Sequence, residues 1–468
     1  MTKILSGLNA LVWGAPALIL ILGVGLWYSL RLRFVQLRLL PRAIRLFCRK
    51  LRSSDDAGTS SFRALCTALA ATVGTGNLVG VAGAICLGGP GAIFWMWVCG
   101  IFGMVTKYAE TVLAVRYRVK SGDGYVGGPM YVMTRGLGEK FRPMAAAYCL
   151  FGVVAAFGVG NATQINAVAT GVHTVLDMAG IPSSRGGDLL LGALLAGLIA
   201  TLMLGGAGRI GTAAEYLVPA VSVVYVGLCL GVLISRAQAV PGALAAIFQG
   251  AFRPRAVTGG MLGSAFRALQ VGCSRGVFTN EAGMGTASIA HAAAQVRHPA
   301  EQGLMGIMEV FLDTIVICTM TALAILCSGV PIPYGIDAGA ELTSDAFAAV
   351  YGPAASVFLA LSLGCFAVAT VLGWGLYGAR CAEFLFGAGA WRFFAVAEGA
   401  MVFYGVLADT ATVWQLAETV NGLMAIPNLI TLAAMASQVV GLTLDYQKQD
   451  GPAVRGGTYA DIHQRQPL

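Results

Sequence analysis

The feature that most limits how this chain can fold is a series of long apolar stretches. About eleven of them follow one another, each near the twenty or so residues that cross the hydrocarbon core of a membrane. Inside a bilayer no water can bond to the backbone, so such stretches must form helices that close their own hydrogen bonds. The expected helices lie near residues 8–30, 63–87, 91–116, 143–172, 188–205, 212–234, 262–290, 300–327, 351–378, 391–407 and 411–438.

The composition supports this fold class. Of 468 residues, 57% are hydrophobic and 11% are charged, against about a quarter charged in soluble domains. We therefore predict an all-α polytopic membrane protein without a large soluble domain. The 11 cysteines form no CxxC pair and no Cys/His cluster, so we expect no metal site of that kind. No motif indicates a cofactor or an obligate protein partner.

The net charge of +8 does not indicate a nucleic-acid partner, because the basic residues are concentrated in short loops. Many lie within residues 31–63 and 116–142, whereas residues 328–351 contain neither lysine nor arginine. An excess of basic residues is typical of cytoplasmic loops. We therefore expect a multi-pass protein of a bacterial-type inner (plasma) membrane, with the N-terminus outside and the C-terminus cytoplasmic.

The second apolar stretch is interrupted in its middle. Residues 71–98 read ATVGTGNLVGVAGAICLGGPGAIFWMWV, and the two glycines of Gly74-Thr75-Gly76-Asn77 weaken a helix at membrane depth. Two interpretations are open. The segment is a kink or a close helix contact, since glycine is frequent in membrane helices, or unwound backbone lines a cavity and binds a ligand or an ion.

A second interruption reads GCSRGVFTNEAGMG over residues 272–285, five spans after the first. Interrupted helices at corresponding positions of two halves indicate inverted repeats with a binding site at their interface. The chain then divides into an N-terminal helix with a basic segment (1–62), a first five-helix repeat (63–234), an inverted five-helix repeat (235–438) and a tail (439–468).

Both interruptions carry groups that suit an amino-acid zwitterion and Na⁺. Backbone N–H groups near Thr75, Gly76 and Asn77 would begin a half-helix, where the helix dipole favours a carboxylate. Carbonyl groups at the other half-helix end can accept an ammonium group or coordinate Na⁺. The side-chain oxygens of Thr279 and Asn280 would add neutral ligands at the second break. Their alternative role is local capping of the broken helix.

Polar side chains on two further helices could complete such a site. Asn161 and Gln164 are three residues apart and therefore share a helix face, and Thr370 and Trp374 are four apart on a later helix. The ordinary explanations are an interhelical hydrogen bond for Asn161 and packing for Trp374. The sequence leaves both interpretations open.

Several ionisable residues lie inside apolar stretches, where a charge is costly. Lys107 and Glu110, at positions i and i+3, are expected to pair with each other, whereas Glu309 and Asp313 have no evident partner. Any of Glu110, Glu281 and Asp313 could carry a proton, although a structural pair or a helix-end position also explains them. No nucleophile–base set and no HExxH spacing indicates an enzyme.

Long motifs resemble the signature of the alanine/glycine:cation symporters. They are the run TSSFRALCTALAATVGTGNLVGVAGAICLGGPGAIFWMWVCGIFGMVTKYAETVLAVRYR at residues 59–118, GDGYVGGPMYVM, GVFTNEAGMGTASIAHAAAQVRHPAEQG and EVFLDTIVICTMTAL. The similarity extends over nearly the whole chain after the first helix. It implies a leucine-transporter-like fold, with two inverted five-helix repeats after one extra N-terminal helix. It also implies sodium-coupled import of a small neutral amino acid (alanine, D-alanine or glycine) by alternating access.

The resemblance implies roles for individual residues. Thr75 and Gly76 would bind the substrate carboxylate, and Gln164 would lie near the amino group. The remaining substrate contacts would be backbone acceptors at Gly276, an apolar wall at Phe278, a polar contact at Asn280, and Trp374 on the helix that closes the pocket.

The resemblance also implies a site for the co-transported Na⁺. By analogy with the fold, this ion would lie between the carbonyl groups around Ala71, Val73 and Gly74 and the hydroxyl group of Thr370. The expected partners are therefore a small neutral amino acid, Na⁺ and the lipid bilayer. Two other function classes stay open, which are a proton-coupled transporter of the same fold and an intramembrane enzyme.

Overall fold

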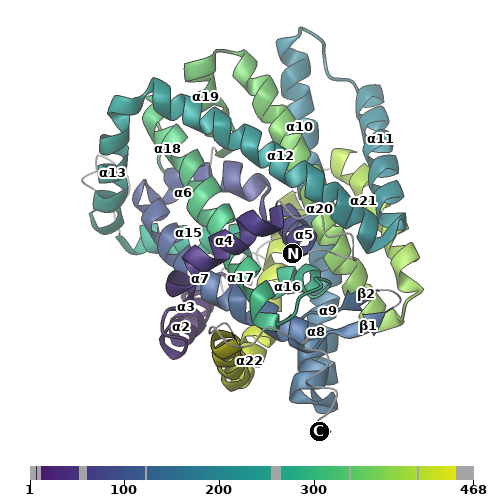
Figure 1. The fold of residues 1–468 in the computed structure, drawn as a ribbon. Coiled ribbons are helices and arrows are strands. Elements are labelled where there is room, and N and C mark those ends of the chain that lie inside the picture. The colour runs from purple at the N-terminus through teal and green to yellow at the C-terminus, as the bar shows by residue number, and fades with distance from the viewer. Residues whose placement is uncertain are drawn as a thin grey trace.

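The computed structural model describes Gly7 and residues 12–51, 61–121, 124–253, 265–336, 339–407 and 411–449. These residues are mostly helical, and segments far apart in the sequence pack side by side (Figure 1). Within them, eight helices are long and apolar enough to cross a membrane, or nine if one bent pair forms a single span. The protein is therefore a multi-pass membrane protein.

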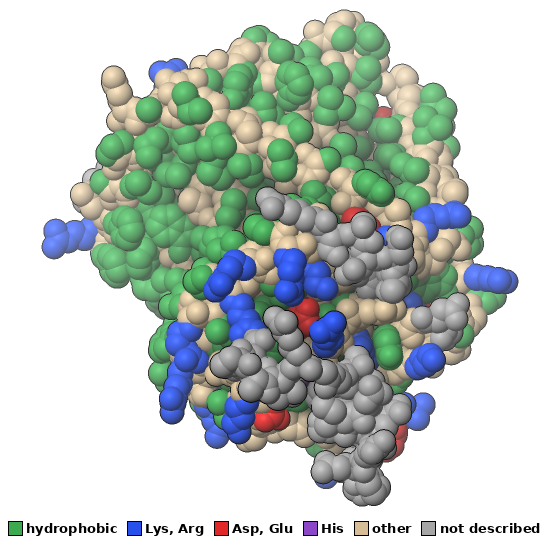
Figure 2. Space-filling model, in the orientation of Figure 1, with side chains coloured by type: hydrophobic (Ala, Val, Ile, Leu, Met, Phe, Trp, Pro, Cys, Tyr) green, Lys and Arg blue, Asp and Glu red, His purple; other side chains and the backbone are tan. Residues whose placement is uncertain are grey.

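The chain starts with an apolar helix and a basic surface helix. The apolar helix is α2 (Ala15–Arg31), and α3 (Val35–Arg38) is a short turn after it. The amphipathic α4 (Leu40–Leu51) carries four basic residues and buries Ala43 and Leu46. In Figure 2 apolar side chains cover the face over α12 and α13, whereas lysine and arginine side chains gather around α4. This segregation is typical of a membrane-embedded surface next to a polar one.

Helices overlap each expected stretch of the first half. A short hairpin, β1 (Val119–Ser121) and β2 (Gly124–Val126), and the turns α8 (Pro129–Tyr131), η2 (Val132–Leu137) and η3 (Glu139–Phe141) connect two of them. The helices are α5 (Ser61–Thr72) with η1 (Gly76–Gly80) and α6 (Val81–Gly88), α7 (Gly91–Arg116), α9 (Arg142–Phe157) with η4 (Gly158–Ala162) and α10 (Thr163–Met178), α11 (Arg185–Leu204) and α12 (Gly206–Ser235).

The second half contains the remaining helices. A short η5 (Ala237–Ala239) leads into α13 (Val240–Phe252), and α19 (Gly339–Tyr351) precedes α20 (Ala354–Phe386). The other helices are α15 (Ala265–Asn280), α16 (Thr286–His291), α17 (Pro299–Val310) with η6 (Phe311–Cys318) and α18 (Thr319–Ser328), α21 (Ala390–Leu407) and α22 (Ala411–Gln449).

The first interruption is a true break in the helix. α5 ends at Thr72, and the chain continues as η1 and α6 after a bend of 55°. η1 is a π-helix, as are η4 and η6, and both of these contact the elements around the break. Short π-helical segments inside membrane helices are frequent at functional sites, since they displace backbone groups from the regular ladder.

The second interruption lies later than the sequence suggests. α15 runs through Gly272 and Gly276 to Asn280, and the unwound residues are 281–285. The two glycines lie inside an unbroken helix. Their lack of a side chain lets α7 pack closely against α15. A Cβ atom on Gly272 would lie 2.2 Å from the carbonyl oxygen of Ala92. Small residues at helix contacts are a common device in membranes.

Candidate functional site

The two broken helices meet in the interior of the molecule. A Cβ atom on Gly76, at the start of η1, would lie 3.1 Å from Cγ2 of Thr279, near the end of α15. A Cβ atom on Gly74 would lie 2.6 Å from the hydroxyl oxygen of Thr370 on α20. The glycines therefore allow the unwound backbone of the first break to touch two other helices.

A small polar pocket lies at this junction. Its walls enclose about 310 Å³ that no atom fills, of which about 20 Å³ can hold the centre of a water molecule. Residues from α5, η1, η4, α10, α15, α20 and α22 contribute to it. They are Ala71, Thr72, Gly74, Thr75, Gly76, Val159, Gln164, Phe278, Thr279, Glu281, Thr370, Trp374 and Asn421.

The structure brings together most of the residues expected to form a site. Ala71, Gly74, Thr75, Gly76, Gln164, Phe278, Thr370 and Trp374 all line the pocket. Four others, Val73, Asn77, Gly276 and Asn280, do not line it. The roles of all twelve stay predictions.

Thr75 and Gln164 join the first break to α10. The hydroxyl group of Thr75 donates to Oε1 of Gln164 over 3.1 Å, and Nε2 of Gln164 donates to the carbonyl of Val159 over 3.1 Å. Thr75 and Gly76 also stand at the beginning of the half-helix formed by η1 and α6. First-turn N–H groups have no partner within their own helix, so they are available to an anion.

Asn77 is occupied in holding the break together. Its Oδ1 accepts from the backbone N–H of Gly74 over 2.9 Å, and its Nδ2 donates to Oδ1 of Asp313 over 2.6 Å. This buried amide thus satisfies the unwound backbone and ties it to η6. Its side chain does not reach the pocket.

Asn280 has a similar place at the second break. Its Oδ1 accepts from the N–H of Ala282 over 3.0 Å, and its Nδ2 donates to the hydroxyl of Thr314 over 3.2 Å. Thr279 donates to the carbonyl of Gly276 over 3.0 Å. Both side chains cap the end of α15, which is the alternative left open by the sequence. Thr279 nevertheless also lines the pocket.

Two aromatic side chains form the apolar side of the pocket. Trp374 is 1% exposed, and a Cβ atom on Gly160 would lie 2.3 Å from the Cβ of Trp374. The glycine of η4 therefore leaves the room that Trp374 fills. Phe278 lies beside Gly76, with ring carbons 3.6 and 3.7 Å from the position of its missing Cβ atom. Together the two rings leave little space beside the unwound backbone.

Sequence reasoning missed several pocket residues. Thr72 and Val159 follow directly from proximity, because they adjoin residues already expected there. Asn421 on α22 is 1% exposed, and its Oδ1 has no hydrogen-bond partner among the described residues. The one sequence signal that could have indicated Asn421 is its place as a polar residue in an apolar stretch. Glu281 was considered only as a proton carrier, yet it lines the pocket.

Glu281 is held in an unusual conformation. Its φ of 54° lies in the left-handed region that costs energy for a residue with a Cβ atom. Its N–H closes α15 by donating to the carbonyl of Val277 over 2.8 Å, and the hydroxyl of Thr286 donates to its Oε2 over 2.6 Å. These bonds fix the carboxyl group at the edge of the pocket.

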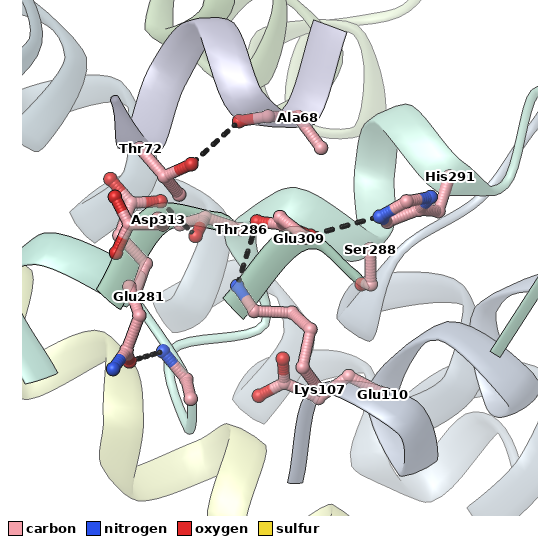
Figure 3. A network of polar contacts seen from close by, with 12 residues as sticks. Ala68, Thr72, Lys107, Glu110, Glu281, Thr286, Ser288, His291, Glu309 and Asp313 are labelled. Atoms are coloured by element: carbon pink, nitrogen blue, oxygen red, sulfur yellow. Dashed lines mark hydrogen bonds and ion pairs between the residues drawn. The ribbon is translucent and has the colours of Figure 1, made fainter. Parts of the chain in front are cut away.

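The expected ion pair between Lys107 and Glu110 is wrong. Nζ of Lys107 lies 3.4 Å from Oε1 of Glu309, and His291 lies 2.9 Å from the other carboxyl oxygen of Glu309. Figure 3 shows Lys107 reaching Glu309, which also faces His291. All three side chains are fully buried. Lys107 therefore pairs with a carboxyl group on another helix and not with the acidic residue one turn along its own helix.

Glu110 instead holds the second break. Its Oε1 accepts from the N–H groups of Gly283 and Gly285 over 2.9 and 3.1 Å, and from Nδ2 of Asn428 over 2.8 Å. Both glycines have positive φ, which residues with a Cβ atom adopt poorly. The carboxyl group thereby satisfies backbone donors that no helix satisfies, as buried backbone groups in a membrane require.

The oxygen atoms at the first break fit a hard monovalent cation. The last carbonyl groups of α5, including that of Ala71, lack helical partners because the helix ends at Thr72. The hydroxyl oxygen of Thr370 lies beside Gly74 and donates its own proton to the carbonyl of Phe366, so a lone pair stays available. In the described part of the chain no group of three His, Cys, Asp or Glu residues could hold a metal ion.

A helical membrane protein with a small polar pocket at two broken helices has the architecture of a secondary transporter. The comparisons with known proteins agree with this class. Residues 1–456 match the family model described as the sodium:alanine symporter family, and the chain belongs to this family. The resemblance inferred from the sequence motifs is therefore confirmed.

Relatives cover almost the entire chain. An uncharacterized transporter of Haemophilus influenzae is 43% identical over 95% of this chain and 96% of its own length. The sodium/alanine symporter AgcS of Methanococcus maripaludis is 42% identical over 94% of this chain and 96% of its own. The probable sodium/glutamine symporter GlnT of Bacillus subtilis is 37% identical over 97% and 92%. The protein is thus a sodium-coupled amino-acid symporter.

The fold is similar to that of a solved transporter. The crystal structure of MhsT in complex with L-phenylalanine superimposes with a TM-score of 0.57 at 14% identity. The match covers 84% of this chain and 99% of MhsT. The fold is therefore leucine-transporter-like, which agrees with the expectation from the sequence.

Proposed function

We propose that this protein imports a small neutral amino acid, namely alanine, D-alanine or glycine, together with Na⁺. The observation that carries the proposal is the pocket at the first break, where backbone donors and acceptors of the broken helix and a hydroxyl group lie within one small space. Such a site can hold substrate and ion side by side. Each then favours the closed pocket for the other, which couples the two movements.

The substrate carboxylate lies at the start of η1 in this proposal. The N–H groups of Thr75 and Gly76 begin the half-helix, and the dipole of η1 and α6 favours a negative charge there. A side chain at Gly76 would meet Thr279, so glycine keeps the backbone open to the ligand.

The substrate ammonium group meets side-chain acceptors in the same pocket. Oε1 of Gln164, the carboxyl group of Glu281 and Oδ1 of Asn421 are the side-chain acceptors that line it. Oδ1 of Asn421 lacks a donor within the described chain, and a buried acceptor without a donor is costly. A substrate ammonium group would supply that donor.

The Na⁺ ion lies next to the carboxylate, between the carbonyl groups of Ala71, Val73 and Gly74 and the hydroxyl of Thr370. These are neutral oxygen ligands at the end of a half-helix, where the negative end of the helix dipole adds to their attraction for a cation. The close approach of Gly74 to Thr370 supports this placement.

The size of the pocket limits the substrate. Only about 20 Å³ can hold the centre of a water molecule, and Phe278 and Trp374 stand beside that space. A leucine or aromatic side chain would require both rings to move. Alanine and glycine differ by one methyl group, a difference of about 1–3 kcal/mol in a hydrophobic pocket.

The proposal includes the arrangement of the spans. About eleven helices form two inverted five-helix repeats, 63–234 and 235–438, after one N-terminal helix. The basic loops lie inside, so the N-terminus is outside and the C-terminal tail is cytoplasmic. Movement of the broken helices against the other spans then opens the pocket alternately to each side. We infer transport and no catalytic activity.

Proton coupling is a second candidate function. It is favoured by Glu281, a buried carboxyl group at the edge of the pocket with a strained backbone. A titratable group that contacts the substrate could carry a proton in place of Na⁺.

Uptake of labelled alanine into proteoliposomes tests the proposal. Uptake should require an inward Na⁺ gradient, and glycine or D-alanine should compete better than glutamine. Replacing external Na⁺ by choline under an imposed pH gradient separates the two coupling ions. Unchanged uptake without Na⁺ would overturn sodium coupling.

Two variants locate the pocket in the same assay. Gln164→Ala should raise the substrate concentration needed for half-maximal uptake by about tenfold or more, the cost of one buried hydrogen bond to a charged group. Asn166→Ala, on the same helix but outside the pocket, is the matched control. Equal effects of the two variants would show that the site is misplaced.

A further inference from the structure

A carboxyl group outside the pocket lining has no hydrogen-bond partner for either oxygen within the described chain. Glu398 lies on α21, within an apolar span, and is fully buried. Neither Oε1 nor Oε2 accepts a hydrogen bond from any described residue. An ionised carboxylate in this setting is among the most costly arrangements a membrane protein can contain, so the group requires an explanation.

Asn161, which contacts Glu398, also has a buried oxygen without a hydrogen-bond partner. Nδ2 of Asn161, on the π-helix η4, donates to the backbone carbonyl of Glu398 over 3.0 Å. The amide is fully buried, and its Oδ1 has no partner among the described residues. Two neighbouring side chains from two spans therefore present three buried acceptor oxygens that accept no hydrogen bond within the described chain.

The surroundings supply no cation. A Cβ atom on Gly375 of α20 would lie 3.6 Å from Oε1 of Glu398 and 2.8 Å from the sulfur of Met203, so the carboxyl group faces small and apolar neighbours. α21 packs against α10, α11, α20 and η4. η4 contains no ionisable residue. On the other three helices His173 pairs with Asp188, Arg380 pairs with Glu383, Tyr377 packs against Trp374, and Cys381 lies beside Gly152. Cys365 is half-buried, and Asp177 and Arg185 are exposed.

One proton removes most of this defect. A carboxylate and an amide oxygen are both acceptors, whereas a protonated carboxyl group has one O–H donor and can donate to the amide oxygen. We propose that Glu398 and Asn161 form a proton-binding site separate from the substrate pocket, in which Glu398 takes up H⁺ from solvent and the resulting carboxyl O–H donates a hydrogen bond to Oδ1 of Asn161. No other bond forms or breaks, and the proton returns to solvent when the site releases it.

The site is connected to the pocket by two short paths. Asn161 and Gln164 are three residues apart on one continuous helix, and Gln164 accepts from Thr75 at the first break. Gly375, which contacts Glu398, follows Trp374, a wall of the pocket. Loss of the proton places an uncompensated negative charge behind both Gln164 and Trp374. The closed pocket therefore requires the proton. By linkage, substrate and proton then strengthen each other's binding.

The pH dependence of uptake tests the inference under a constant Na⁺ gradient with equal pH on both sides. In the unaltered protein, uptake should fall on the alkaline side, by up to about tenfold per pH unit once the site loses its proton. Glu398→Gln imitates the protonated form, because its amide can donate to Asn161. This variant should keep uptake and lose the alkaline fall.

The matched control is Glu383→Gln, which changes a paired carboxylate at the end of α20. It should keep the alkaline fall of the unaltered protein. The same fall in Glu398→Gln would overturn the proposal, as would an unaltered protein without any such fall. Glu398→Gln could instead change the affinity for Na⁺ and leave the alkaline fall as it is. This result would assign the carboxyl oxygens of Glu398 and Oδ1 of Asn161 to Na⁺ and would also overturn the proposal.

A measurement without transport separates this inference from the proposed function. Infrared difference spectra of the reconstituted protein, recorded between neutral and alkaline pH, should contain the carbonyl band of a protonated carboxyl group. That band should be absent in Glu398→Gln and shifted in Asn161→Ala, which removes its acceptor. If the band persists unchanged in Glu398→Gln, the proton is elsewhere, whatever the substrate proves to be.

Discussion

Nδ2 of Asn77 donates to Oδ1 of Asp313 over 2.6 Å, while Oδ1 of the same asparagine accepts from the backbone of Gly74 over 2.9 Å. One buried side chain thus ties the first broken helix to η6 and also satisfies its unwound backbone. The break is therefore a fixed feature of the fold, held from within the membrane, and its geometry depends on Asn77.

Asn77→Ala should accordingly destabilise the protein as well as impair uptake. It leaves the N–H of Gly74 and Oδ1 of Asp313 without the partner that Asn77 supplies, at about 1–3 kcal/mol for each unsatisfied group. Thermal unfolding in detergent measures the loss. Thr75→Ala is the control, because it should weaken substrate binding with a smaller change in the unfolding temperature. The reverse ranking in stability would contradict this role of Asn77.

The buried pair of Lys107 and Glu309 predicts a strong effect with a specific rescue. Lys107→Met should cost about 3–5 kcal/mol, since it leaves Glu309 charged and buried with only His291 beside it. The double variant Lys107→Met with Glu309→Gln should recover much of that loss. The fraction of folded, monodisperse protein and its unfolding temperature measure both.

A second lysine provides the control for this pair. Lys50 lies 3.9 Å from Glu301 near the surface, with side chains that are 19% and 14% exposed. Lys50→Met should change stability by about 0–1 kcal/mol. A double variant as unstable as Lys107→Met alone would show that the lysine acts by packing and not by its charge.

The sequence predicts the helices of this protein well because membrane depth leaves so little choice. Apolar length indicates where helices form, although eight or nine of the described helices, and not eleven, are long and apolar enough to cross a membrane. Glycine next to threonine and asparagine indicates the first break. The same reasoning misplaced the second break, because Gly272 and Gly276 serve the contact with α7. Glycine in a membrane helix can mark either a break or a close contact with another helix, and only the position of the neighbouring helix distinguishes the two.

The site was predicted less completely for a related reason. Thr75 and Gln164 lie next to obvious signals, but Asn421 lies on the last helix, and its approach to the pocket depends on how that helix packs. Likewise, Lys107 and Glu110 are neighbours along one helix, yet each finds its partner on other elements. Local spacing predicts which pairs can meet, and tertiary packing decides which do.

Gly74→Ala should abolish uptake by closing the proposed ion site. The new methyl carbon would lie 2.6 Å from the hydroxyl oxygen of Thr370, closer than two such atoms can approach. Thr370→Ala in the same protein removes that oxygen and should restore folding, measured by the unfolding temperature. It should not restore sodium-dependent uptake, because the hydroxyl ligand is then missing. Recovery of both properties would exclude Thr370 as a ligand of Na⁺.

Asn421→Ala tests whether the unpartnered amide oxygen receives the substrate ammonium group. Removing an acceptor of a charged donor should weaken alanine binding by about 1.5–3 kcal/mol, which is about tenfold to a hundredfold in Kd. Because Oδ1 has no partner inside the described chain, the folded protein should lose little stability.

Gln438→Ala, on the exposed part of the same helix, is the control for Asn421→Ala and should leave Kd unchanged. Equilibrium binding of labelled alanine at saturating Na⁺ measures the effect without transport. Asn421→Asp keeps an acceptor at this position and should retain binding of the ammonium group. If Asn421→Ala binds alanine normally, the ammonium group depends on Gln164 and Glu281 alone, and Asn421 only completes the wall.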